Sequence, residues 1–134
     1  MARARQIRGS VAIMAVIDVI ALVAFVVAGM SSHDEGTVPA YFFRNAFPLV
    51  VSWLVVAALL GTYRRPGFAS LWRTWLVAVP IALVVRSVWV GSPSGTRFLT
   101  FLAVGMAFTG LFLVVGRGLT TLITGRGYPS RRRA

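Results

Sequence analysis

The sequence predicts an all-α membrane protein in which four transmembrane helices form an antiparallel up-down bundle. The 134 residues are 57 % apolar and only 13 % charged, whereas a soluble domain carries about 25 % charged residues. The apolar residues fall into four long runs, each close to the ~20 residues that a helix needs to cross a hydrocarbon core. Most arginines lie at the ends of those runs, as expected for loops and tails outside a bilayer.

The chain divides into a transmembrane domain and two basic tails. We expect residues 1–9 to form a cytoplasmic N-terminal tail, residues 10–116 the four-helix domain, and residues 117–134 a cytoplasmic C-terminal tail. Backbone groups in lipid must be hydrogen-bonded within their own segment, which favours helices over strands. The predicted helices cover residues 10–30, 46–63, 71–90 and 98–116.

The first predicted helix begins after a basic segment and contains one acid, Asp18. A basic start followed by an apolar run is also typical of a cleaved signal peptide. This run is longer than a signal peptide requires, and an acid within it is atypical. We therefore expect an uncleaved helix.

The later helices are separated by stretches rich in Gly, Pro and Ser. The second helix has an alternative start at Tyr41, and Pro80 interrupts the third. The fourth ends where Gly116 and Gly118 flank Arg117, because glycine disfavours the interior of a helix. The separating stretches are SSHDEGTVPAYFFRN, RRPGFAS and GSPSGTR.

The distribution of arginine predicts the orientation. All 14 basic residues are Arg; eleven lie in the two tails or near the connection between the second and third helices, and two, Arg44 and Arg97, lie on the other side. Cytoplasmic loops carry the excess of positive charge. Both termini are therefore predicted to be cytoplasmic, in the plasma membrane (the inner membrane of a bacterial cell), with the tails near anionic lipid headgroups.

Several function classes are disfavoured by composition. The chain has no Cys, one His and three acids, so thiolate chemistry is excluded and the membrane segments offer no catalytic constellation. We expect no enzymatic activity, no cofactor and no metal. A net charge of +11 does not indicate nucleic-acid binding here, because the arginines form no continuous stripe.

Polar residues within or beside the helices are the candidate sites. Asp18 is expensive in hydrocarbon and must face the bundle interior. Its candidate partners are Arg86 and Arg73 of the third helix. The partner is left open because Arg86 also has the reach to turn outward, toward the loop that holds His33, Asp34 and Glu35. A second candidate site, at the outer mouth, comprises His33, Asp34, Glu35 and Arg44.

Two functions fit these features. The first is a structural or accessory membrane subunit in which Asp18 and Arg86 are polar ties between helices. The second is a small proton- or cation-coupled transporter that acts through Asp18. Four short helices enclose little volume, so transport would require a homo-oligomer, and an accessory subunit would pack against itself or a larger membrane partner.

A family resemblance covers nearly the whole chain. It is carried by Asp18, AGMSSHDEG (28–36), FPLVVSWLVVAALLGTY (47–63), VVRSVW (84–89) and VVGR (114–117). In these segments the sequence resembles the small membrane proteins of domain-of-unknown-function family 3054. The resemblance implies four membrane helices in a protein of similar length, and it implies no particular activity.

Overall fold

The computed structural model contains four long helices and no other regular element in the residues that it describes, which are 2–32, 39–65 and 67–124. Side chains are described from residue 11 to residue 122, with the same gaps. The helices are α1 (Ala2–Ser32), α2 (Pro39–Leu59), α3 (Phe68–Val90) and α4 (Thr96–Thr124).

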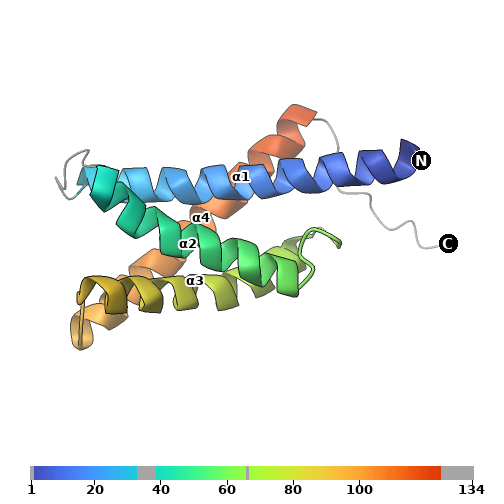
Figure 1. Cartoon of the computed structure of the whole chain (residues 1–134). Coiled ribbons are helices and arrows are strands. Elements are labelled where there is room, and N and C mark those ends of the chain that lie inside the picture. The colour runs from blue at the N-terminus through green and yellow to red at the C-terminus, as the bar shows by residue number, and fades with distance from the viewer. Residues whose placement is uncertain (1, 33–38, 66, 125–134) are drawn as a thin grey trace.

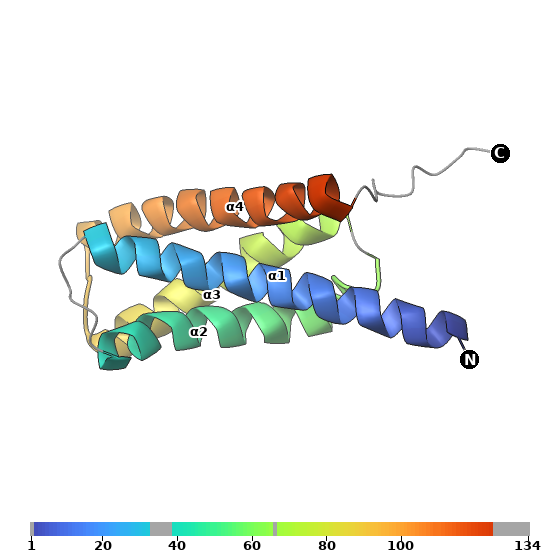
Figure 2. The ribbon, with the colours of Figure 1, turned by 90° about the horizontal axis from the view of Figure 1, so that it is seen from above.

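The helices form an up-down bundle, as the sequence predicts. Each packs against two others: α2 contacts α1 and α3, and α4 contacts α3 and α1. The beginning of α1 and the end of α4 lie at the same end of the bundle (Figures 1 and 2). The four helices therefore close into a ring in chain order.

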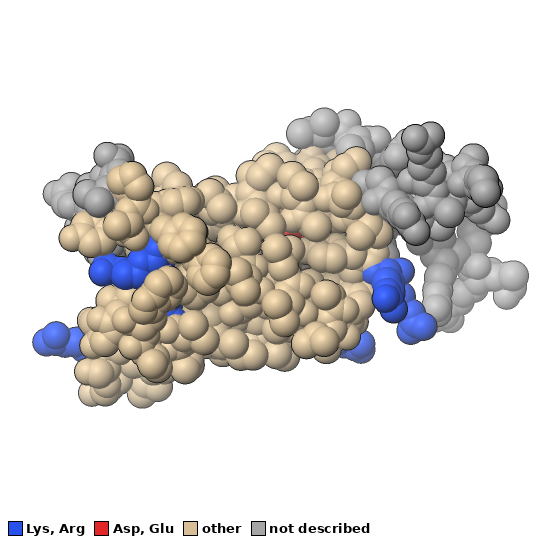
Figure 3. Space-filling view, in the orientation of Figure 1, with Lys and Arg blue, Asp and Glu red and all other residues tan. Residues whose placement is uncertain are grey.

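The outside of the bundle is apolar. All four helices are long and apolar enough to cross a membrane, over Val11–Ser32, Pro39–Leu59, Phe68–Val90 and Thr96–Leu122. Large apolar side chains are exposed on all four helices, and those of Leu59 and Val88 are 80 % and 78 % exposed. Arginines gather at the two ends of the molecule, and the broad band between them shows almost no charged side chain on this face (Figure 3). These features identify a multi-pass membrane protein.

Helices α1 and α4 are longer than the sequence indicates. Helix α1 begins at Ala2, within the predicted tail. Helix α4 continues past Gly116 to Thr124, so Arg117 belongs to a helix rather than to a tail. The end of α3 at Val90 agrees with the prediction, and Gly91 caps it in the left-handed conformation with φ of 70°, which glycine adopts without strain.

Glycines let α4 approach its neighbours closely. A Cβ atom on Gly116 would lie 3.3 Å from the Cβ of Ala21 in α1, and one on Gly105 would lie 2.8 Å from a methyl group of Leu83 in α3. Close backbone approach through small residues is a common means of packing helices in membranes. Gly116 thus has a packing role between α1 and α4, in place of the helix-ending role expected from the sequence.

Candidate functional site

Asp18 lies completely buried inside the bundle, with none of its surface exposed. The helical period explains its position, because Leu22 and Val26 follow it at intervals of four residues and are also buried. Asp18 is seven residues from Val11, where the apolar span of α1 begins, which corresponds to ~10 Å along the helix. The carboxylate therefore lies at membrane depth and must be satisfied by protein groups.

Arg117 of α4 is the ionic partner of Asp18. Its Nε donates to Oδ1 at 3.0 Å and its Nη2 donates to Oδ2 at 2.7 Å, and only 4 % of its side chain is exposed. Two parallel hydrogen bonds between a guanidinium and a carboxylate make this the strong, geometrically specific form of ion pair. The pair carries no net charge, which lowers the cost of placing both groups in hydrocarbon.

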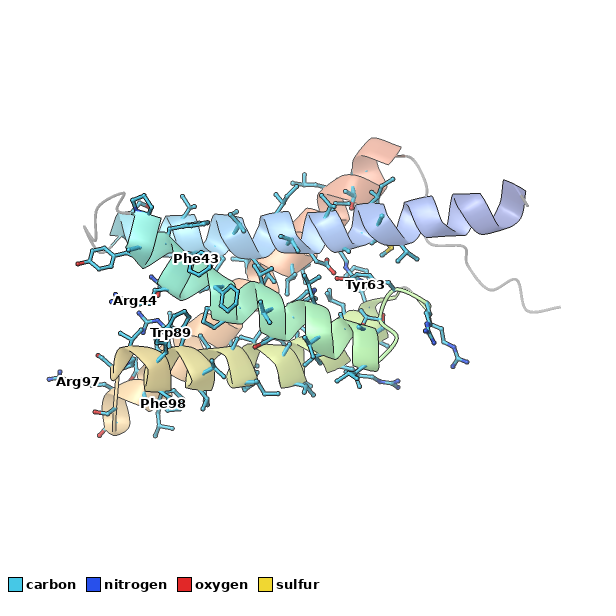
Figure 4. The ribbon with its side chains drawn as sticks, in the orientation of Figure 1. Phe43, Arg44, Tyr63, Trp89, Arg97 and Phe98 are labelled. Carbon is cyan, nitrogen blue, oxygen red and sulfur yellow. The ribbon has the colours of Figure 1, made fainter. Side chains whose placement is uncertain are left out.

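Two aromatic side chains extend this ion pair to α2. The hydroxyl of Tyr63, just after α2, donates to Asp18 Oδ2 at 2.9 Å, and Trp53 Nε1 donates to the Tyr63 hydroxyl at 3.0 Å. Tyr63 lies between α1 and the end of α2 (Figure 4). We call Asp18, Arg117, Tyr63 and Trp53 the Asp18 cluster; within it, Asp18 accepts three hydrogen bonds from two other segments of the chain.

The environment of Tyr63 favours its neutral form. Burial raises the pKa of the Tyr63 phenol above its ordinary value of 10, and the neighbouring Asp18 carboxylate raises this pKa further. Both effects disfavour a phenolate, because a second negative charge would be poorly solvated and repelled. Tyr63 therefore remains a hydrogen-bond donor to Asp18 throughout the physiological pH range.

Further polar contacts connect α3 to its neighbours. The hydroxyls of Thr62 and Thr74 are hydrogen-bonded to each other, which joins the turn after α2 to α3. Trp75 Nε1 donates to the Thr109 hydroxyl at 3.2 Å, which joins α3 to α4. With the Asp18 cluster, every pair of neighbouring helices in the ring has a polar cross-link.

Arg86, a predicted partner of Asp18, lies instead in the opposite half of the bundle, where it binds polar groups of α2 and of the loop after α3. Its Nε donates to Asn45 Oδ1 of α2 at 2.8 Å and its Nη1 donates to the carbonyl oxygen of Ser92 at 3.0 Å. Its guanidinium lies over the ring of Phe101, 4.9 Å from the centroid. Arg86 is thus a tie between α2 and α3, and it does not contact Asp18.

Arg73, the other predicted partner of Asp18, is exposed on the surface of α3. It lies one residue before the buried Thr74, and successive residues of a helix point about 100° apart. The prediction that an arginine of the third helix pairs with Asp18 is therefore wrong, and the partner is Arg117 of α4.

The second candidate site is only partly described. His33, Asp34 and Glu35 lie outside the described residues. Arg44 is half-buried near the beginning of α2, with its guanidinium 4.8 Å from the centroid of the Tyr41 ring. Arg44 lies at the opposite end of the bundle from Tyr63 (Figure 4). In the described part of the chain, no three His, Cys, Asp or Glu residues come together as metal ligands would.

Sequence reasoning missed Arg117 as the partner of Asp18 because Gly116 and Gly118 flank Arg117 and indicate the end of a helix there. A signal was nevertheless present: Thr109, Leu113 and Arg117 are spaced four residues apart, and all three are buried on one face of α4. Extending that stripe past Gly116 would have placed an arginine on the face that packs against α1. The hydrogen bond from Tyr63 to Asp18 was also missed.

Comparison with known proteins gives a family and no activity. The family model described as "Protein of unknown function (DUF3054)" matches residues 15–120 of this chain. Neither the curated proteins nor the solved structures contain a match. The matched region includes Asp18, Tyr63 and Arg117, so it covers the ion pair and its phenol donor. The chain therefore belongs to the DUF3054 family of membrane proteins of unknown function.

Proposed function

We propose that this protein is a structural or accessory membrane subunit in which the Asp18 cluster is a permanent tie between helices. The observation that carries the proposal is the donor set around Asp18: two nitrogens of Arg117 and the hydroxyl of Tyr63 donate to a carboxylate with no exposed surface. A carboxylate so occupied is suited to holding α1, α2 and α4 in register.

A proton- or cation-coupled transporter acting through Asp18 is the competing function. Its carboxylate would have to bind and release a proton or cation during each cycle. Arg117 supplies a fixed positive charge at 2.7 Å, which opposes the binding of a proton or a cation by the carboxylate. The contact between Arg86 and Asn45 gives the other half of the bundle a second tie, which also fits the structural role.

The proposal includes an orientation and a location. We place both termini in the cytoplasm and the four helices in the cytoplasmic membrane, with the arginine-rich tails near anionic headgroups. The distribution of arginine supports this orientation. The start of α1 and the end of α4 lie at the same end of the bundle, which is consistent with this orientation. A periplasmic reporter fused after Ala134 should remain inactive, and an active reporter would reverse the assigned orientation.

The partner of an accessory subunit would bind the apolar surface. That surface is broad on all four helices, and either a second copy or a larger membrane protein would cover part of it within the bilayer. The proposed role requires no catalytic step, no cofactor and no metal.

Reconstitution separates the tie from the transporter. Wild-type protein, Asp18→Asn and the control Arg73→Gln are placed in vesicles that contain a pH-sensitive dye, and proton flux is driven by a pH or cation gradient. We expect the proton flux of all three proteins to equal that of protein-free vesicles. Flux in the wild type that Asp18→Asn abolishes and Arg73→Gln retains would establish the transporter and overturn the proposal.

A further inference from the structure

An elongated cavity occupies the half of the bundle opposite the Asp18 cluster. Its volume is about 470 Å³, within the range of about 300–1,000 Å³ typical of ligand sites. It lies among the end of α1, the beginning of α2, the end of α3 and the part of α4 from Phe101 to Phe112. Its lining includes Gly29, Asn45, Arg86, Phe101, Phe108 and Phe112.

The cavity has an apolar length and a polar end. Along α4 it extends from Phe101 to Phe112, eleven residues or ~16 Å of helix. The polar side chains of its lining, those of Ser32, Asn45 and Arg86, come from the helix ends at one end of the bundle. This division matches a molecule with a long apolar chain and a polar headgroup.

The dimensions correspond to one leaflet of a bilayer. A leaflet contributes about half of the ~30 Å hydrocarbon core, close to the length of the cavity. Arg86 lies four residues before the end of α3 at Val90, or ~6 Å along the helix, near the level of lipid headgroups. Phe108 lines the cavity and is 50 % exposed, so the cavity opens to the surface that faces the acyl chains.

Charge at this end selects the headgroup. Among the described residues that line the cavity, Arg86 is the charged one, and Arg44 and Arg97 lie at the same end of the bundle (Figure 4). A guanidinium matches the geometry of phosphate oxygens, to which it donates in a planar fork. Arg86 is already positioned by Asn45 and Phe101, which reduces the side-chain entropy lost on binding.

We propose that this cavity binds one anionic phospholipid of the surrounding bilayer, with an acyl chain between α1 and α4 and the phosphate beside Arg86. The site is separate from the Asp18 cluster, and the proposal does not depend on the protein being a structural subunit. Helices α1 and α3 do not contact each other directly. The lipid would lie between them in this half of the bundle and contact both.

Two variants test the two halves of the site. Arg86→Gln removes the positive charge, with Arg97→Gln as a control because Arg97 is exposed at the same end. Gly29→Leu fills the apolar part, since a Cβ on Gly29 meets no atom within 4 Å. Gly118→Leu is its control, because Gly118 is also helical with open space at its Cβ and does not line the cavity.

Native mass spectrometry provides the measurement. Purified protein is given equal amounts of phosphatidylglycerol and phosphatidylcholine with identical acyl chains. The wild type and both controls should keep one lipid, with phosphatidylglycerol preferred. Arg86→Gln should lower that preference about tenfold, as expected for loss of a charge-assisted hydrogen bond, and Gly29→Leu should lose both lipids.

Each contrary result overturns the proposal. A wild type without a retained lipid has no such site, and equal retention of the two lipids refutes an anionic headgroup. An unchanged preference in Arg86→Gln refutes the role of Arg86. If that variant does not fold, Gly29→Leu decides alone: full lipid retention by a folded Gly29→Leu protein places the lipid elsewhere.

Discussion

The two halves of this bundle solve the problem of intramembrane charge in different ways. In the half that contains the start of α1, Asp18 and Arg117 neutralise each other, and further polar contacts join the turn after α2 to α1 and to α3. In the other half, Arg86 is held by an amide, a carbonyl oxygen and an aromatic ring, and a cavity adjoins it. The first half is built for rigidity, and the second leaves space for a ligand.

The largest expected effect comes from breaking the ion pair. Arg117→Leu leaves the Asp18 carboxylate buried without its cation, and removing one partner of a buried pair costs about 3–5 kcal/mol. Unfolding by SDS in mixed micelles, followed by circular dichroism, measures the loss. The exposed Arg73 supplies the control: Arg73→Leu should change the free energy of unfolding by less than about 0.5 kcal/mol. Similar losses of unfolding free energy in both variants would mean that the buried ion pair of Arg117 contributes no more to stability than an exposed arginine does.

A matched pair of glycine substitutions compares packing in the two halves. Gly116→Leu forces a side chain against Ala21, where a Cβ already comes within 3.3 Å, and overpacking of this kind costs about 1–3 kcal/mol. Gly29→Leu enters the cavity and should be neutral, or stabilising by up to about 1 kcal/mol through helix propensity. Thermal denaturation in detergent ranks the two. Equal destabilisation would show that the cavity half is packed as tightly as the other.

A smaller effect is expected from the phenol of the cluster. Tyr63→Phe removes one of the three donors to Asp18 and the acceptor of Trp53. Hydrogen bonds between membrane helices average about 0.6 kcal/mol, so we expect a loss of about 0.5–1.5 kcal/mol in the same SDS assay. A loss as large as that of Arg117→Leu would assign the main tie to Tyr63 instead of the ion pair.

The smallest effect is spectroscopic. Because burial and Asp18 raise the pKa of Tyr63 above 10, the ultraviolet difference between wild type and Tyr63→Phe should show no phenolate step near pH 10 in the folded protein. The step should appear after unfolding. Since the pKa is raised by folding, the stability that Tyr63 contributes is complete below pH 10 and is lost as pH rises further. A normal step in the folded protein would place Tyr63 in water.

The sequence predicts the fold well and the site only in part. Four apolar runs of membrane length fix the number of helices and their alternation, since lipid permits few other structures. The burial of Asp18 is likewise predictable, because a lone acid in such a run must avoid lipid. Its partner is not, because the choice among Arg73, Arg86 and Arg117 depends on how far α4 extends and on which face of each helix meets α1.

Local propensity was misleading at one decisive point. Gly116 and Gly118 each disfavour a helix by roughly 1 kcal/mol relative to alanine, which favours a helix end at Arg117. The ion pair and the close contact of Gly116 with Ala21 exist only after α1 and α4 have packed, and these tertiary contacts outweigh the local cost. The cavity also cannot be predicted from the sequence, since its lining comes from side chains of four helices.

The measurement that tests the central claim most directly is a double-mutant cycle on the free energy of unfolding, using Asp18→Asn, Arg117→Gln and the protein that carries both. A structural ion pair predicts strong coupling: each single variant leaves one buried group without its partner, and the double variant loses at least about 1–2 kcal/mol less than the sum of the singles. Additivity within about 0.5 kcal/mol would show that Asp18 and Arg117 do not stabilise the bundle as a pair, and the proposed tie would be contradicted.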